Sequence, residues 1–202
     1  LNEANLHKIK HGLVIAGVGD PGPTTYKKTR RGDAEIDQAV AHVLKHSGDG
    51  FEILEFFPYG YDERQFCSPG FNLPVGNLMR TPHGKYPEYH TSADDLGFVQ
   101  AEYLADSFSK ALSVMDVLEE NKTYVNQSPK GEPQLGKRGL YRAIGGSQDV
   151  KQTELAMLWV LNFSDGEHSL LDIADRSGLE FEVIRSAADL LRDHALLKER
   201  GA

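Results

Sequence analysis

The sequence contains one cysteine and no long hydrophobic run, and each deficit excludes a class of protein. Among 202 residues the single cysteine is Cys67, so no disulfide can form within the chain and a disulfide-stapled secreted fold is excluded. No run reaches the roughly 18 apolar residues that a transmembrane helix needs, so we expect no membrane partner. No activating motif surrounds Cys67, and we interpret it as a small packed residue rather than a nucleophile.

Positive charge is also scarce. The chain has 22 Lys and Arg against 30 Asp and Glu, which gives a formal net charge of -8 at pH 7. Because nucleic-acid binding depends on clustered Lys and Arg that neutralise phosphates, we expect no nucleic-acid partner. No signal peptide is recognisable, and together with the lone cysteine this predicts a cytoplasmic protein.

The first clear structural element is an apolar run at 12–19, GLVIAGVG, which ends at Asp20 before Pro21-Gly22-Pro23. A short run of this kind, bounded by turn residues, predicts a buried strand. Ligands of open α/β sheets gather at the carboxyl ends of strands, so Asp20 is placed to act at a site. The alternative is a structural Asp in the turn before proline.

Three further elements continue the same part of the chain. After Asp33, apolar residues at helical spacing predict an amphipathic helix that covers a sheet. FEILEFFP at 51–58 predicts a second strand, and GFNLPVGNLM at 70–79 predicts a third. The alternation of strands with a helix is typical of α/β proteins. We therefore expect part of a mixed, mostly parallel sheet flanked by helices.

A basic segment, TYKKTRRGD, is predicted to be a loop between the first strand and the helix. Its cations are Lys27, Lys28, Arg30 and Arg31. A solvated charge cluster is one interpretation. Guanidinium groups can also bind carboxylates and phosphates through two parallel hydrogen bonds, so Arg30 and Arg31 are candidate contacts to a substrate anion.

The segment at 71–99, FNLPVGNLMRTPHGKYPEYHTSADDLGFV, carries the most information about function. It places His90 between an aromatic residue and a threonine, with the acids Asp94 and Asp95 following. Neutral imidazole suits zinc and carboxylates can orient it, so His90 is a candidate metal ligand. The alternative is that His90 only packs against the helix that follows, which Ser92 and Asp95 are spaced to cap.

A long amphipathic helix is predicted to start at Ser92 and to fade near Glu119. Its larger apolar residues recur at helical spacing, so we expect them to face the core. This predicted buried stripe consists of Leu96, Val99, Tyr103, Phe108, Leu112 and Met115.

The stretch YGYDERQFCSPGFNLPVGNLMRTPHGKYPEYHTSADDLGFV resembles the late part of the zinc-dependent aminopeptidase superfamily, which includes the glutaminyl cyclases. More narrowly, it resembles bacterial aminopeptidase-like proteins that are associated with polysaccharide biosynthesis and carry a C-terminal winged-helix domain. The resemblance covers roughly residues 6–120 and is specific over 57–99. It implies a zinc-exopeptidase-like fold with one or two zinc ions in the full-length protein.

The resemblance also assigns metal-site roles to individual residues. The family's late Tyr-His-Thr supplies a zinc-binding histidine, which falls on His90. An earlier ligand Asp that closes a buried strand falls on Asp20. Asp62 and Asp94 would orient ligands or a substrate amine. This chain departs from the pattern at Glu63, where the superfamily usually has a histidine.

The implied activity is hydrolysis of an amide in a peptide-like or aminoacyl small molecule by a metal-activated water. The general base and the remaining ligands have no counterpart in this chain, so the rest of the catalytic domain, upstream of Leu1, is an expected partner. A homo-oligomer is left open. We expect this chain alone to be inactive. Residues expected to line the substrate pocket are Tyr61, Arg64, Tyr89, Arg30 and Arg31.

Residues 151–202 predict a separate winged helix-turn-helix domain, which follows the aminopeptidase-like part at 1–120 and a linker at 121–150. TELAMLWVLNFSDG, LLDIADRSG and EFEVIRSAADLLRDHALL predict three helices, and LLKER predicts a strand. The expected core residues are Leu155, Leu158, Trp159, Ile173, Ile184, Leu191 and Leu196.

The charge of this predicted domain argues against DNA as its partner. Residues 151–202 contain six Lys and Arg against ten Asp and Glu, so 6 - 10 = -4. We expect a role in protein contact or packing. Two other functions stay open: a metal-free binding protein with the aminopeptidase fold, and a winged-helix regulator.

Overall fold

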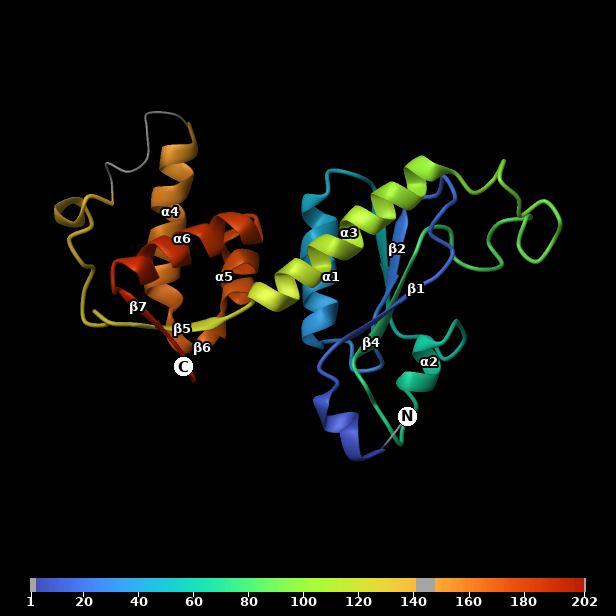
Figure 1. The fold of residues 1–202 in the computed structure, drawn as a ribbon, viewed down its shortest axis with the longest axis horizontal. Helices are drawn as coiled ribbons and strands as arrows, with labels where there is room; N and C mark the ends of the chain where they lie inside the picture. Colours follow the sequence, from blue (N-terminus) through green and yellow to red (C-terminus); the bar gives the residue numbers. More distant parts are fainter. Residues whose placement is uncertain (1–2, 141–147, 202) are drawn as a thin grey trace. The chain divides into compact units, whose positions relative to one another are not determined.

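The structure is a computed structural model that describes residues 3–140 and 148–201. The chain divides into two compact units, Leu1–Leu118 and Glu119–Ala202, and each unit has its own sheet (Figure 1). No helix in these described ranges is both long and apolar enough to cross a membrane.

The first unit is built on a four-stranded sheet in the order β1-β4-β2-β3. Its strands are β1 (Gly12–Ile15), β2 (Thr24–Lys27), β3 (Phe51–Leu54) and β4 (Val75–Met79). β1 pairs with β4 and β2 with β3 in parallel, whereas β2 and β4 are antiparallel. The expected mixed, mostly parallel sheet is therefore confirmed.

Strand β2 was not predicted, because its sequence TTYK contains little that is apolar. All four of its residues are nevertheless buried. The strand lies inside the sheet between β3 and β4, so its backbone is paired on both sides. The prediction that Lys27 belongs to a solvated loop is therefore wrong.

Two helices, α1 (Glu35–His46) and α3 (Ala101–Glu120), cover the same face of this sheet. The hydroxyl of Tyr26 on β2 donates to Asp37 on α1 over 2.8 Å, and Lys110 on α3 donates to Thr24, two residues along the same strand. Residues two apart in a strand point to one face. A 3-10 helix at Glu3–Lys8 precedes β1.

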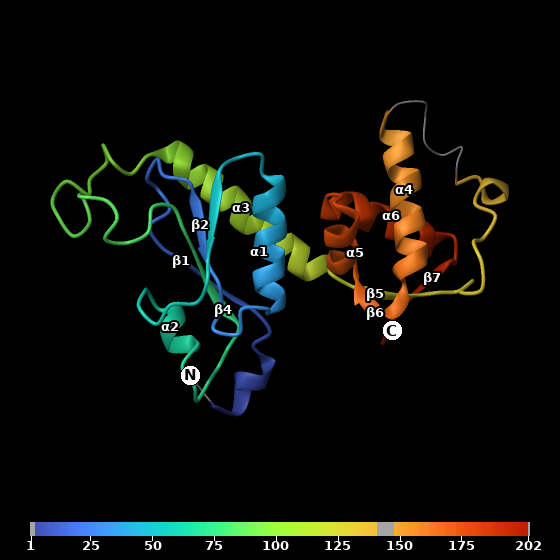
Figure 2. The same ribbon diagram turned by 180° about the vertical axis from the view of Figure 1, so that it is seen from behind.

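The short helix α2 (Glu63–Phe66) lies on the other face, as the view from behind shows (Figure 2). There the ammonium group of Lys27 donates to the carbonyls of Phe57 and Tyr59, each over 3.0 Å. Cys67 at the end of α2 is fully buried and packs with Leu73 and Val75. This burial agrees with its interpretation as a packed residue.

Helix α3 differs from its prediction in both start and orientation. It begins at Ala101 rather than Ser92, and residues 91–99 form turns, so Ser92 and Asp95 do not cap it. The residues that face the sheet are Ser107, Lys110, Ala111, Val114 and Val117. The predicted stripe is mainly exposed, with Leu96 at 91%, Phe108 at 63%, Leu112 at 47% and Met115 at 61%. Hydrogen bonds explain the orientation, because the Ser107 hydroxyl donates to the Val18 carbonyl over 3.0 Å.

The second unit has the winged-helix architecture that was predicted. Three helices pack together beside an antiparallel sheet of order β6-β5-β7. Its elements are β5 (Thr123–Asn126), a 3-10 helix (Gly136–Arg138), α4 (Gln148–Phe163), β6 (Asp165–Ser169), α5 (Leu170–Ser177), α6 (Phe181–Asp193) and β7 (Leu197–Glu199).

The expected linker at 121–150 contains the central strand of this second sheet. β5 pairs with β6 on one side and with β7 on the other, so a three-stranded sheet could not form without it. The compact unit accordingly starts at Glu119 rather than at 151. Residues 141–147 of the expected linker lie outside the described residues.

Helix α4 buries a different face from the predicted one. Ala156, Met157, Val160 and Leu161 are buried, whereas Leu155 is 48% exposed and Leu158 and Trp159 are half-buried. The other expected core residues, Ile173, Ile184, Leu191 and Leu196, are buried as predicted. The α4 sequence is apolar on more than one side, so periodicity alone does not select the face that packs.

Candidate functional site

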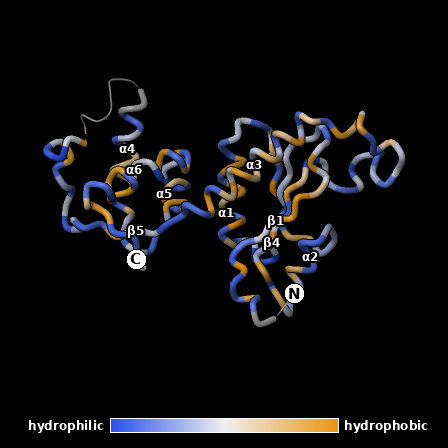
Figure 3. Tube along the Cα trace, viewed as in Figure 1, coloured by the Kyte–Doolittle hydropathy of each residue, from blue (hydrophilic) through white to orange (hydrophobic). Residues whose placement is uncertain are grey.

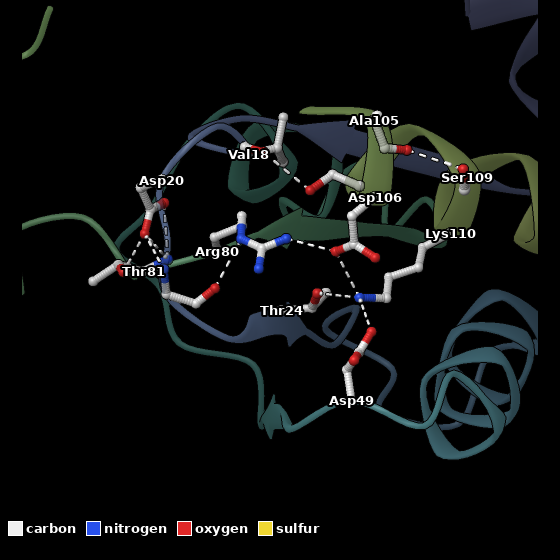
Figure 4. Close-up of polar contacts among 12 residues, drawn as sticks. Val18, Asp20, Thr24, Asp49, Arg80, Thr81, Ala105, Asp106, Ser109 and Lys110 are labelled. Carbon is white, nitrogen blue, oxygen red and sulfur yellow. Dashed lines mark hydrogen bonds and ion pairs between the residues drawn. The ribbon is translucent and has the colours of Figure 1, made fainter. Parts of the chain in front are cut away.

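Asp20 lies where the chain leaves strand β1 and is almost fully buried, at 4% exposure. Its Oδ2 accepts hydrogen bonds from the Thr81 hydroxyl over 2.5 Å and the Gly22 amide over 2.9 Å (Figure 4). The Thr81 amide lies 3.2 Å from Oδ1. Thr81 follows β4, which runs parallel to β1, so their carboxyl ends meet at one edge of the sheet. Asp20 therefore connects the loop after β1 with the loop after β4, at the end of the strands where the sequence predicted a site.

A charged network holds this edge against helix α3 (Figure 4). Arg80 donates to the Gly22 carbonyl over 2.8 Å and to Asp106 over 2.6 Å. Asp106 also accepts from Lys110 over 2.7 Å. Although burial opposes it, hydrogen bonding to Lys110 and Arg80 lowers the pKa of Asp106. This network was not predicted from the sequence, because Arg80 follows an apolar strand and Lys110 lies in an amphipathic helix without any motif.

Five rings form what we name the aromatic cluster: Tyr59, Tyr61, His83, Tyr86 and Tyr89. The His83 ring centroid lies 5.2 Å from that of Tyr59, 5.2 Å from that of Tyr61 and 6.3 Å from that of Tyr89. The Tyr86 and Tyr89 centroids are 5.5 Å apart. The members come from the loop after β3 and the loop after β4, so the fold brings together segments far apart in sequence.

Electrostatics connect this cluster with the Asp20 edge. Burial, and then the carboxylates of Asp94 and Asp20, raise the pKa of Tyr86. Burial, followed by the neighbouring Tyr86, raises the pKa of Tyr61, which also hydrogen-bonds Tyr86. A Cβ built on Gly17, just after β1, would lie 3.6 Å from the Tyr61 hydroxyl. Tyr86 is thus influenced by two predicted site carboxylates, and Tyr61 is connected to Tyr86 by a hydrogen bond.

His83 was not singled out in the sequence, although its ring is central to the cluster. Burial, and then the charge of Lys27, lower its pKa. The imidazole is therefore neutral at neutral pH. A lone histidine between a proline and a glycine is typical of a turn, so the sequence did not indicate that His83 belongs to a site.

His90, the predicted zinc ligand, is exposed and has a left-handed backbone with φ of 59°. Its ring stacks on that of Tyr89 at a centroid distance of 4.0 Å. A non-glycine residue in this conformation is uncommon, and such residues cluster at functional sites. The stacking fixes the imidazole beside the aromatic cluster while leaving it open to solvent.

Asp62 and Arg64 are exposed in and beside helix α2. The carbonyl of Asp62 accepts from the Gln65 amide over 2.9 Å, and its side chain does not cap the helix. In the described ranges, no hydrogen bond or ion pair joins either side chain to Asp20 or His90. Their assigned roles at the metal and in the substrate pocket stay predictions.

The unusual Glu63 has a clear structural partner. It is fully buried and forms an ion pair with Lys27, which is 3% exposed. Neither carboxylate oxygen has a hydrogen bond of ordinary geometry within the described residues, so charge attraction holds the pair. A Cβ on Gly60 would collide with both charged groups. Glycine at position 60 therefore allows the close approach that the pair requires.

Arg30 and Arg31 lie at the opposite end of the strands from Asp20. Because β2 runs antiparallel to β4, the loop after β2 emerges opposite Asp20. Arg31 donates to the Asn72 carbonyl over 2.7 and 3.1 Å, and Arg30 donates to the Asn72 side chain over 3.1 Å. These contacts give both arginines a structural role, holding the turn before β4. They do not place either arginine with the other candidate residues.

The donors in this chain fit a zinc site only in part. Within residues 3–140 and 148–201, no group of three or more His, Cys, Asp or Glu side chains could hold a metal ion. Imidazole and carboxylate are suitable zinc ligands, and zinc usually takes four. His90 offers an accessible ring, and among the described residues Oδ1 of Asp20 accepts a single hydrogen bond, of 3.2 Å from the Thr81 amide. Two such donors would need further ligands from elsewhere.

The chain is similar to parts of two longer proteins. A Clostridium acetobutylicum protein, provisionally named a polysaccharide biosynthesis protein with an aminopeptidase-like domain, is 55% identical over 197 residues, which is 98% of this chain and 45% of that protein. A crystal structure from the same organism, provisionally named a peptidase, matches with 52% identity and a TM-score of 0.89, covering 98% of this chain and 44% of that one. The chain thus spans less than half the length of these relatives.

Family models cover both units. Residues 122–199 match the winged helix-turn-helix model. Residues 1–121 match the model of a domain of unknown function named DUF4910. The first match covers more than half of the chain and includes every residue of the aromatic cluster and the Asp20 edge, and the chain therefore belongs to the DUF4910 family.

Proposed function

We propose that this chain is one part of a cytoplasmic, aminopeptidase-like hydrolase linked to polysaccharide biosynthesis. The observation that carries the proposal is the position of the buried Asp20 carboxylate at the carboxyl ends of β1 and β4, with the Tyr61 hydroxyl close to Gly17 just after β1. The 55% identity to a relative named for an aminopeptidase-like domain supports the same function. The substrate is a peptide-like or aminoacyl small molecule.

His90 and Asp20 are the proposed zinc ligands, and the other ligands and the general base come from outside this chain. A bound zinc ion supplies Lewis-acid polarisation of a carbonyl and a water of lowered pKa. Thr81 and Gly22 hold the Asp20 carboxylate in one orientation, as ligating carboxylates require. Tyr89 holds the His90 ring by stacking.

The remaining residues bind and orient the substrate. Tyr61 and Tyr86 stay protonated because burial raises the pKa of each hydroxyl. Tyr61 donates to Tyr86, and the Tyr86 hydroxyl donates to a substrate carbonyl. Asp94 is exposed and accepts a substrate ammonium group. Asp62 supports the ligands, and Arg64 and Tyr89 line the pocket.

The test is made in the full-length protein. His90→Ala should lower bound zinc, measured by mass spectrometry of the metal, and aminopeptidase activity together. His7→Ala, at an exposed position in the first 3-10 helix, is the matched control and should change neither. Unchanged zinc content in His90→Ala would contradict the assignment.

One observation favours a second candidate. Because the described residues contain no three-donor group, the family fold could also serve as a metal-free binding protein in the same process. Absence of stoichiometric zinc from the full-length protein after zinc reconstitution would support this candidate over the hydrolase. Measurement of the metal content therefore distinguishes the hydrolase from the binding protein without a known substrate.

A further inference from the structure

Helix α3 carries a row of apolar side chains that the described residues of its own unit leave largely exposed. Leu104 is 44% exposed, and Phe108, Leu112 and Met115 are exposed to a similar or greater degree. At about 100° per residue, these four positions fall within roughly 80° of the helix circumference. The residues that face the sheet occupy another sector, and the third sector is polar. Figure 3 shows hydrophobic residues along α3 and the neighbouring strands.

This apolar row is continuous with a groove beside β1, the terminal strand of the sheet. A groove of about 270 Å³ separates α3 from β1, and its walls include Leu13, Ile15, Val114, Met115 and Leu118. Met115 belongs to both the row and the groove. Ile15 at the end of β1 is 50% exposed. The exposed apolar surface is therefore continuous rather than a set of isolated residues, and such surfaces mark interaction sites.

The edge of β1 is also unprotected. β1 is the terminal strand of the sheet, and its sequence GLVI carries no charge. The amides of Gly12 and Ala16 donate to the β4 side over 3.0 and 3.2 Å, so the amides of Leu13 and Ile15 point to the open side. Edge strands usually carry charged side chains that discourage pairing with a further strand. The strand at the other edge of the sheet, β3, carries Glu52.

We propose that the β1 edge, the groove and the α3 row form one docking surface for a βα segment from the rest of the longer polypeptide. A strand would add to β1, and apolar side chains would cover Phe108 and Met115. The argument for this occupant is length, because relatives 52–55% identical to this chain contain more than twice its length. This inference concerns the same domain as the proposed function but does not depend on its chemistry.

The test uses thiol labelling, because Cys67 is fully buried and is the only cysteine. Phe108→Cys and Ser109→Cys place thiols on the apolar row and on the polar sector beside it. Two proteins are compared: the 202-residue chain, and a full-length chimera in which the chain replaces the matching region of the Clostridium acetobutylicum protein. The probe is a maleimide, and its reaction rate is followed by mass spectrometry.

In the 202-residue chain, both thiols should react rapidly. In the chimera, the Phe108→Cys thiol should react at least tenfold more slowly, whereas the Ser109→Cys thiol should keep its rate. Hydrogen exchange at the Leu13 and Ile15 amides should slow in the chimera as well. If Phe108→Cys does not fold by circular dichroism, Met115→Cys with Asp116→Cys as control makes the same comparison.

Two outcomes would overturn the proposal. Equal labelling of both thiols in the chimera would show that the surface stays open. Protection of the Phe108→Cys thiol already in the 202-residue chain would show another occupant, and light scattering would then identify a second copy from the doubled mass. Neither outcome bears on zinc content, so this inference and the proposed hydrolase fail independently.

Discussion

Two residues of opposite charge, Lys27 and Glu63, determine how the loop after β3 meets the sheet. Both are buried, and Lys27 also binds the carbonyls of Phe57 and Tyr59. Tyr59 and Tyr61 of the aromatic cluster lie in this loop. The ion pair thus positions two of the five rings of the aromatic cluster without taking part in its chemistry.

Glu63→Gln should destabilise the first unit by about 3–5 kcal/mol, because it leaves the Lys27 ammonium buried without a countercharge. Urea unfolding followed by circular dichroism measures the loss. The double variant Lys27→Met, Glu63→Leu should recover much of it, since a well-packed apolar pair is often as stable as a buried ion pair. Glu52→Gln, at an exposed position on β3, is the control. A single Glu63→Gln variant as stable as that control would refute the role of the pair.

Asp106 should give the first unit a stability that depends on pH. Its pKa is lowered in the folded protein, so its contribution is complete above its unfolded pKa of about 3.9. The contribution is lost as the pH falls through the lower, folded value. Thermal unfolding measured between pH 3 and pH 7 should therefore show a decline at the acid end.

Replacement of Asp106 tests the same network. Asp106→Asn should cost about 3 kcal/mol, because Arg80 and Lys110 are nearly buried and lose a shared partner. Asp116→Asn, on the exposed side of the same helix, should cost little. If Asp106→Asn unfolds with the same pH dependence as the unmodified chain, another carboxylate is responsible.

At the scale of elements, the sequence pattern predicted the positions of α1 and of strands β1, β3 and β4, but not strand β2 or the packed faces of α3 and α4. Of the apolar positions that its spacing predicted to be buried, helix α1 buries Ile36, Ala39, Val40 and Leu44, whereas Val43 is half-buried. Strand β2 was missed because pairing on both sides, rather than hydrophobicity, places Thr24 and Lys27 inside. Tertiary pairing of this kind leaves no trace in a local window.

The face of α3 could not be predicted for a related reason. Its apolar residues do recur at helical spacing, but they lie beside the sector that faces the sheet rather than in it. A polar residue, Ser107, occupies the inward face because the Val18 carbonyl accepts its hydrogen bond. Similarly, Asp20 was predicted as a site residue from its position after an apolar strand, whereas no pattern in the sequence indicated its partner Thr81.

The start of helix α5 provides a test at this scale. Ser169 and Asp172 form a capping box, with the Asp172 amide donating to the Ser169 hydroxyl over 3.2 Å and the Ser169 amide donating to Asp172 over 2.8 Å. Ser169→Ala should cost about 1 kcal/mol. Trp159, the only tryptophan, reports unfolding of this unit by fluorescence. Ser186→Ala on the exposed side of α6 is the control, and an equal effect of both would deny the cap.

At the scale of the whole molecule, the acidic winged-helix unit is predicted not to bind DNA. Both arginines of α6 are already paired, Arg185 with Glu182 and Arg192 with Asp189, each over 2.7 Å. Repulsion between the acids and a phosphate backbone grows as salt falls. Electrophoretic mobility of duplex DNA should therefore be unchanged by the 202-residue chain at about 50 mM salt, where electrostatic affinity is strongest. Sequence-specific binding there would make the regulator the leading function.

Because β2 runs opposite to its neighbour β4, the loops at the two ends of the strands in the first sheet have different roles. Asp20 and Thr81 occupy one end, and Arg31 holds Asn72 at the other. Changes in the loop after β2 can therefore alter folding while leaving the candidate site untouched. For protein engineering, this makes the exposed Asp33 a place to attach a reporter, beyond the two arginines that contact Asn72 and remote from the chemistry that the reporter would be used to follow.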